Sequence, residues 1–144
     1  MSQPLAYWDS SALVPLCAPQ PQSAGAMALY KDLQVVAWWA TEVEMVSGLT
    51  RLERMRQISH AQFLHGKRLA RQIVHAWISA ESPASTVAGA CSLLEKYPLR
   101  AADALQLAVA LESCDHRTQG FIFVTADLRL ADAARQTGFS VEFI

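Results

Sequence analysis

Short apolar runs alternate along the chain with segments of helical spacing. Four runs have the length and the aromatic or β-branched content of strands, and they cover 5–8, 34–39, 121–125 and 141–144. Helical patterns cover the segments 10–16, 20–33, 41–58, 60–80, 86–94, 99–111 and 128–136, the last of which stops before Gly138. This alternation predicts an α/β domain with a mainly parallel sheet of four to five strands.

The helical segment 99–111 is unusual because nearly all of its side chains are apolar. Apart from Arg100, Asp103 and Gln106, it contains only alanine, leucine and valine. Such a helix is expected to be buried on most sides, where a carboxylate is costly unless its charge is compensated. We therefore expect a basic side chain, a helix terminus or a metal cation beside Asp103.

Composition narrows the class of protein. The chain has 144 residues, which predicts one domain over 1–144, and its 52% hydrophobic and 17% charged residues exclude disorder. No apolar run approaches the roughly 20 residues of a membrane span, and no leader is recognisable, so we expect a soluble cytoplasmic protein without a membrane partner. The four histidines and three cysteines lack metal-ligand spacing, and the cysteines are assigned as reduced core thiols.

Charge and large apolar side chains leave two questions open. The net charge of −1 gives no global signature of nucleic-acid binding, but six of the twelve Lys and Arg residues fall within 51–71. They form either a solvated helical hairpin or a local phosphate-binding rim. The large apolar residues in question are Trp38, Trp39, Phe63, Leu64 and Trp77. We expect most of them to pack in the core, and any that remain exposed would suit a protein interface.

Acidic residues follow the predicted strands. Asp9 comes directly after 5–8, Glu44 lies in the first turn after 34–39, and Asp127 is two residues past Thr125. Ligands of open α/β sheets bind beyond the carboxyl ends of the strands. We expect these three acids and Asp103 to converge there.

Each acid also has a purely structural interpretation. Asp9 and Asp127 suit helix N-caps, Thr41 and Glu44 match a capping box, and Asp103 suits a helix dipole. Capping alone does not explain why four acids converge. Gathered carboxylates need a cation, and an oxygen-only site favours Mg²⁺ or Mn²⁺ and phosphate chemistry.

The order of these motifs resembles a PIN domain, in particular the VapC-type ribonuclease toxins. The matching segments are 7–13, 43–49, 100–108 and 123–130, which together span almost the whole chain. The second segment places Glu44, rather than Glu42, in the site. The chain departs from the family at Gln106, where many relatives carry histidine, and at Leu128, where many carry a basic or polar residue.

The resemblance implies a three-layer α/β/α PIN-like domain and an endoribonuclease that depends on Mg²⁺ or Mn²⁺. It implies an RNA substrate, a cognate antitoxin protein, and a homodimer. Metal ligation would fall to Asp9, Glu44, Asp103 and Asp127, directly or through water. Ser10 and Thr125 would position water or phosphate.

Two other classes of function share features with this sequence. Asp9 follows a first strand, as in phosphoaspartyl proteins. Such phosphatases, however, need an aspartate at the position of Ser11, and a receiver domain needs a lysine at that of Thr125. A PIN-like module that binds RNA or protein without cutting is the stronger alternative. All four acids are retained, which favours the nuclease.

Overall fold

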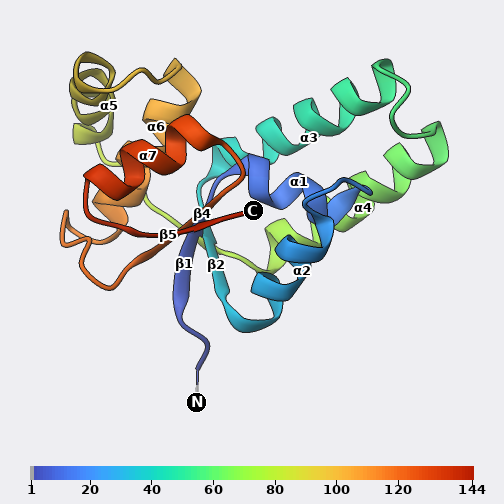
Figure 1. Ribbon diagram of the computed structural model, residues 1–144, viewed down its shortest axis with the longest axis horizontal. Helices are drawn as coiled ribbons and strands as arrows, with labels where there is room; N and C mark the ends of the chain where they lie inside the picture. The colour runs from blue at the N-terminus through green and yellow to red at the C-terminus, as the bar shows by residue number, and fades with distance from the viewer. Residues whose placement is uncertain (1) are drawn as a thin grey trace.

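The computed structural model describes residues 2–144, so Met1, the first residue of the expected domain, lies outside the described residues. Within that range five strands form one sheet in the order β3-β2-β1-β4-β5, and every neighbouring pair is parallel (Figure 1). Their bounds are β1 (Leu5–Trp8), β2 (Gln34–Ala37), β3 (Ile78–Ser79), β4 (Ile122–Thr125) and β5 (Ser140–Phe143). The predicted parallel sheet of four to five strands is confirmed.

Helices cover both faces of this sheet. One face packs against α1 (Ser10–Cys17), α2 (Ser23–Asp32), α3 (Trp39–Arg54) and α4 (His60–Ala76). The other face packs against α5 (Ser85–Lys96), α6 (Ala101–Ser113) and α7 (Leu128–Gln136). Figure 1 shows the two groups of helices on either side of the strands. The predicted three-layer α/β/α fold is confirmed.

The three central strands β1, β2 and β4 are largely apolar because each faces a core on both sides. Trp8 and Val124 belong to the core under α1 to α4, whereas their neighbours Tyr7 and Phe123 belong to the core under α5 to α7. The Tyr7 and Phe123 rings stack with centroids 5.6 Å apart. Continuous apolar runs of this kind are typical of parallel strands buried on both faces.

Two predicted elements ended in the wrong place. The strand predicted over 34–39 stops at Ala37, and Trp39 already belongs to α3. The helix predicted over 60–80 stops at Ala76, and Ile78 and Ser79 instead pair with Val36 and Ala37. In both places an extended tryptophan (Trp38 or Trp77) separates helix from strand, and long-range strand pairing overrides the local pattern.

Smaller differences concern a helix start and a thiol. The helix predicted from residue 20 begins at Ser23, whose hydroxyl instead accepts the backbone N–H of Gln20 in the preceding turn. Cys17 and Cys114 are buried as predicted, but Cys91 is exposed on α5, which contradicts its assignment to the core. Cys91 lies on the outward side of its helix, whose buried positions are Thr86, Ala90 and Leu93.

The strand order places a topological switch point between β1 and β4. From β1 the chain continues outward through β2 and β3, and β4 and β5 are added on the opposite side. The backbone N–H of Asp9, just past β1, donates to Val124 O of β4 at 3.2 Å. Crevices that bind ligands form at such points in α/β sheets. Asp9 and Asp127 each follow one of these two strands.

None of the helices formed by residues 2–144 combines the length and the apolar character that a membrane crossing requires.

Candidate active site

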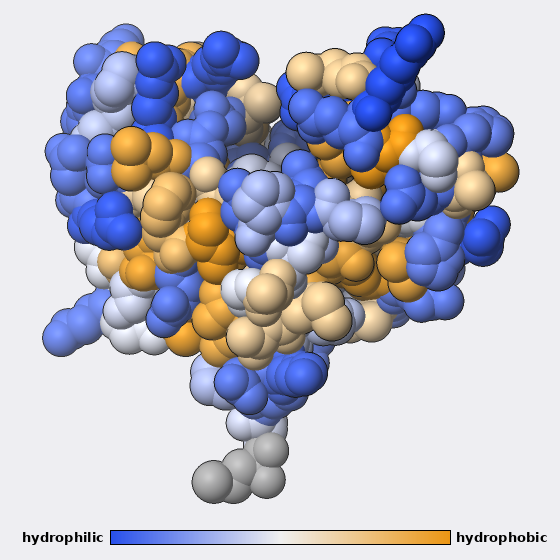
Figure 2. All heavy atoms as spheres, turned by 45° about the vertical axis from the view of Figure 1, so that its right-hand side comes forward, coloured by the Kyte–Doolittle hydropathy of each residue, from blue (hydrophilic) through white to orange (hydrophobic). Residues whose placement is uncertain are grey.

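A cleft of about 1030 Å³ opens at the carboxyl end of the sheet. One wall comes from α1 and α3, and the other from the first residues of α6 and α7. Figure 2 shows the surface hollowed between these two groups of helices, at the top of the view. All four acids singled out in the sequence line this cleft: Asp9, Glu44, Asp103 and Asp127.

Asp9 and Asp127 are helix caps and cleft residues at once. Asp9 accepts the backbone N–H of Ser11 at 3.2 Å and the Ser11 hydroxyl at 2.8 Å, which caps α1. Asp127 accepts the backbone N–H of Leu130 at 3.0 Å and caps α7. The capping interpretation is therefore correct for both residues. Both residues still line the cleft. Each carboxylate has lone pairs that are not involved in capping and that can bind a further group.

Glu44 is not part of a capping box. The helix begins at Trp39 rather than after Thr41, so Glu44 lies in the second turn and not in the first turn after a strand. One carboxylate oxygen, Oε2, accepts hydrogen bonds from Ser10 Oγ and from Gln106 Nε2, each at 2.9 Å. Glu44 is therefore held by α1 and α6 together.

Asp103 is less buried than its sequence predicted. It lies in the first turn of α6 and is half-buried, while its neighbours Ala101 and Ala102 are exposed. Continuous burial of α6 starts only at Gln106. The first turn is open because it forms a wall of the cleft. The fully enclosed carboxylate is Asp9, of which 3% is exposed.

Burial, with a smaller effect of neighbouring carboxylates, raises the pKa of two of the four acids. Burial raises the pKa of Asp9 to about 7, with a smaller contribution from the negative charge of Asp103. Burial also raises the pKa of Asp103, followed by the charges of Asp127 and Glu44, while Arg100 opposes the shift. Asp103 is thus the acid through which the four carboxylates interact electrostatically.

Hydroxyl groups connect the acids below the surface of the cleft. Ser10 lines the cleft and donates to Glu44, whereas Thr125 has no exposed surface. Thr125 Oγ1 accepts the backbone N–H of Asp127 at 3.0 Å and lies 3.2 Å from Ser11 Oγ. Thr125 therefore acts on the site from below the cleft, where its hydroxyl also lowers the pKa of Asp9. Ser11, which sequence reasoning did not select, links Asp9 to Thr125 and also accepts the Ala126 N–H at 2.9 Å.

The donor set fits a hard divalent cation in its chemistry. Every acid in the cleft offers oxygen, and none of the four forms an ion pair with a basic side chain among residues 2–144. Within residues 2–144, however, no three His, Cys, Asp or Glu side chains are assembled into a ligand cluster. Mg²⁺ commonly takes one or two carboxylates and completes its shell with water. The residues therefore fit such an ion without a ready-made cage.

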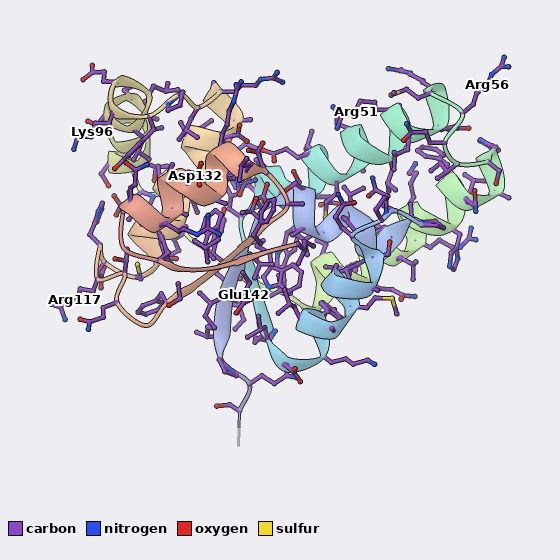
Figure 3. The ribbon with its side chains drawn as sticks, viewed as in Figure 1. Arg51, Arg56, Lys96, Arg117, Asp132 and Glu142 are labelled. Atoms are coloured by element: carbon purple, nitrogen blue, oxygen red, sulfur yellow. The ribbon has the colours of Figure 1, made fainter. Side chains whose placement is uncertain are left out.

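Arginines from three elements surround the acids. Arg51 of α3, Arg100 at the N-cap of α6 and Arg129 of α7 line the cleft and are exposed. Within the described part of the chain none of them is within 4.0 Å of a carboxylate oxygen. Of the six basic residues clustered in 51–71, only Arg51 reaches this cleft, and Arg71 pairs with Glu42 at 2.7 Å. Figure 3 shows Arg51 along α3 and Arg56 at the far tip of the α3–α4 hairpin.

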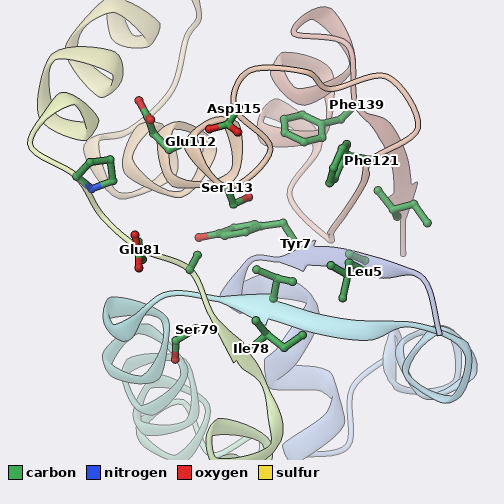
Figure 4. Close-up of a pocket in the computed structure, with 15 residues that line it drawn as sticks. Leu5, Tyr7, Ile78, Ser79, Glu81, Glu112, Ser113, Asp115, Phe121 and Phe139 are labelled. Atoms are coloured by element: carbon green, nitrogen blue, oxygen red, sulfur yellow. The ribbon is translucent and has the colours of Figure 1, made fainter. Parts of the chain in front are cut away.

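A second cavity of about 390 Å³ lies toward the amino ends of the strands. Apolar side chains, including Leu5, Ile78 and Phe121, line it together with Glu81 and Glu112. In Figure 4 the Tyr7 ring lies across this cavity. None of the four cleft acids lines it.

The fold and the cleft define the class of protein: a doubly wound α/β/α domain with a carboxylate site at its switch point. The family model of the PIN domain matches residues 6–136, and the chain belongs to the PIN domain family. Proteins of this family are generally nucleases, and they generally use divalent metals. No curated protein matches the sequence significantly.

Solved structures show the same fold. PAE2754 from Pyrobaculum aerophilum is 18% identical with a TM-score of 0.64, and the alignment covers 98% of this chain and 90% of that one. FitAcB from Neisseria gonorrhoeae is 16% identical with a TM-score of 0.58, and the alignment covers 96% of both chains. At these identities the likeness concerns the fold alone.

The pKa of Asp9 predicts a pH-dependent stability. Between its ordinary value of 3.8 and about 7, the folded protein keeps a proton that the unfolded chain has lost. The free energy of unfolding that depends on Asp9 therefore falls as the pH rises through this range. Asp9→Asn, which keeps a capping side chain, should gain stability over the wild type as the pH rises from 4 to 8. The full gain is at most about 4 kcal/mol.

Urea unfolding of both proteins in EDTA at several pH values measures this difference. Other titrating groups are common to the two proteins and largely cancel. A difference in unfolding free energy that stays constant between pH 4 and pH 8 would contradict the prediction.

Proposed function

We propose that the chain, a single PIN-like nuclease domain over residues 1–144, is a metal-dependent endoribonuclease that hydrolyses RNA phosphodiesters in the cytoplasm. The observation that carries the proposal is the meeting of Asp9, Glu44, Asp103 and Asp127 in one cleft at the switch point of the sheet. Membership of the PIN family supports the reaction class.

Each acid has a distinct position from which to act. Asp9, Glu44 and Asp103 would hold Mg²⁺ or Mn²⁺, directly or through water, and Asp127 completes the negative pocket. When bound, the cation supplies positive charge that stabilises a phosphate undergoing in-line displacement. Ser10 holds the Glu44 carboxylate, and Thr125 fixes the loop that carries Asp127.

The three cleft arginines suit the RNA backbone. Their guanidinium groups are exposed, lie on both walls, and have no carboxylate partner within the described residues. Arginine binds phosphate through paired donors, so these groups favour a polyanion that crosses the acidic floor. The chain therefore does not need a positive net charge to bind RNA locally.

We further propose that the nuclease is the toxin of a type II toxin–antitoxin pair. Large apolar side chains border the cleft: Val43 is 65% exposed and Leu128 is 60% exposed, and both line it. Trp39, one helical turn before Val43, is 70% exposed. An apolar rim with an exposed tryptophan suits a protein partner that covers the site. The homodimer implied by the resemblance stays a prediction.

A non-catalytic module that binds RNA or protein is the alternative. It would have no use for four carboxylates that disfavour one another in the cleft. Their retention supports a cation site and hence the nuclease.

RNA cleavage tests the main proposal. The purified chain should cut RNA with Mg²⁺ or Mn²⁺ and stop in EDTA. Asp9→Asn and Asp103→Asn should each lower the rate by about 10²-fold or more, because each removes charge that holds the cation. Glu112→Gln, an acid of the second cavity, is the matched control and should keep full activity. Full activity in both cleft variants, or in EDTA, would sink the assignment.

Salt dependence tests the arginine rim. RNA binding is measured in EDTA by fluorescence anisotropy at several concentrations of monovalent salt. Arg51→Gln should weaken binding and lower the slope of log K against log salt by about 0.7, since one phosphate contact is lost. Arg56→Gln, at the tip of the hairpin, is the matched control and should leave the slope unchanged. Equal effects of the two substitutions would argue against a track through the cleft.

Growth of a bacterial host tests the toxin assignment separately. Induction of the wild-type chain should stop growth, whereas Asp103→Asn, expressed to the same level, should not. A small protein encoded next to the gene should restore growth when it is co-expressed. If the chain cleaves RNA in vitro but the host grows normally, the nuclease assignment stands and the toxin assignment is wrong.

A further inference from the structure

Gln106 is a buried polar residue, and both polar atoms of its side-chain amide form hydrogen bonds with neighbouring residues. It lies in α6, one turn after Asp103, and is 1% exposed. Its Oε1 accepts the Tyr7 hydroxyl at 2.6 Å. Its Nε2 donates to Thr41 Oγ1 at 3.1 Å and to Glu44 Oε2 at 2.9 Å. The amide therefore joins β1, α3 and α6 beneath the cleft.

The orientation of this amide is determined by its partners. A carboxylate oxygen only accepts hydrogen bonds, so the group 2.9 Å from Glu44 must be the NH₂. The carbonyl oxygen must then face Tyr7, whose hydroxyl has a proton to donate. The opposite orientation would set two acceptors against each other at Glu44. The hydrogen bonds to Tyr7 and to Glu44 therefore require the same orientation of the Gln106 amide.

This arrangement leaves half of the Glu44 carboxylate free. Oε2 receives both Ser10 and Gln106, whereas Oε1 has no hydrogen-bond partner among residues 2–144. Glu44 sits in the second turn of α3, and its side-chain hydrogen bonds among residues 2–144 come from Ser10 and Gln106. Ser10 and Gln106 hold it from two sides.

We infer that Gln106 is a positioning residue for the cation site: its amide clamps Glu44 Oε2 and presents Oε1 to the metal. The inference rests on the proposed function, because Glu44 is taken there as a metal-binding acid. Gln106 is neutral, so it orients the carboxylate without competing for its negative charge. A lysine or arginine in its place would satisfy the same hydrogen bond but would neutralise Glu44. Substitution of a residue that orients a metal ligand commonly lowers the affinity for the metal by about 10- to 100-fold.

Calorimetric titration with Mn²⁺ alone tests this role without RNA. Gln106→Met keeps a similar length but has no donor, and it should weaken Mn²⁺ binding by about 10- to 100-fold. Gln106→His supplies one nitrogen to donate to Glu44 and another to accept from Tyr7, and it should recover much of the loss. Thr41→Val removes a different partner of Gln106 and leaves the bond to Glu44, so it should keep wild-type Mn²⁺ affinity.

A double-mutant cycle separates positioning from general destabilisation. In a Glu44→Gln background, Gln106→Met should cause no further loss of Mn²⁺ affinity, because the carboxylate that it orients is gone. Thermal unfolding of each variant confirms that the folded state is compared. Cleavage kinetics should show a lower kcat for Gln106→Met with little change in the KM for RNA.

The outcomes distinguish this inference from the proposed function. Wild-type Mn²⁺ affinity in Gln106→Met, together with loss of binding in Asp9→Asn, would overturn the role of Gln106 alone. Equal losses in Gln106→Met and Thr41→Val, or additive losses with Glu44→Gln, would also overturn it. Absence of Mn²⁺ binding by the wild-type chain would overturn both the cation site and the positioning residue.

Discussion

The parallel pairing of β1 with β4 is the constraint on which the site depends. These strands are far apart in sequence, yet Trp8 lies opposite Val124 in the sheet. Their carboxyl ends therefore meet, and the residues that follow, Asp9 and Asp127, open into the same crevice. The helices after the two strands begin there as well, capped by these same acids. One pairing thus sets the switch point, two helix starts and half of the acidic cleft.

Electrostatics at this point explains why the site suits a cation. A buried carboxylate is unfavourable by itself, and burial raises the pKa of Asp9 to about 7. A carboxylate buried at a cost in stability is common at functional sites, and it is consistent with the proposed cation site. The hydroxyls of Ser11 and Thr125 and the amide of Gln106 hold the surrounding groups in place.

Local patterns predicted much of the architecture. Apolar runs located β1, β4 and the carboxyl-terminal strand, and the position of each acid after a strand predicted the end of the sheet at which they meet. The predictions failed where a contact is long-range. Ile78 and Ser79 have no strand-like run of their own and become β3 only by pairing with β2. The capping box at Thr41 and Glu44 matched a motif, but α3 begins earlier, at Trp39.

By itself the sequence determined the α/β class and the candidate acids, since both follow from the order of apolar runs and of the residues that end them. Only the tertiary structure decided how those acids are held. Gln106 looked like a departure in an apolar helix, yet it lies against Glu44, 62 positions away along the chain. Asp103 looked like the buried charge, whereas Asp9 is the enclosed one. Burial and hydrogen bonding between distant segments depend on packing, which no local pattern records.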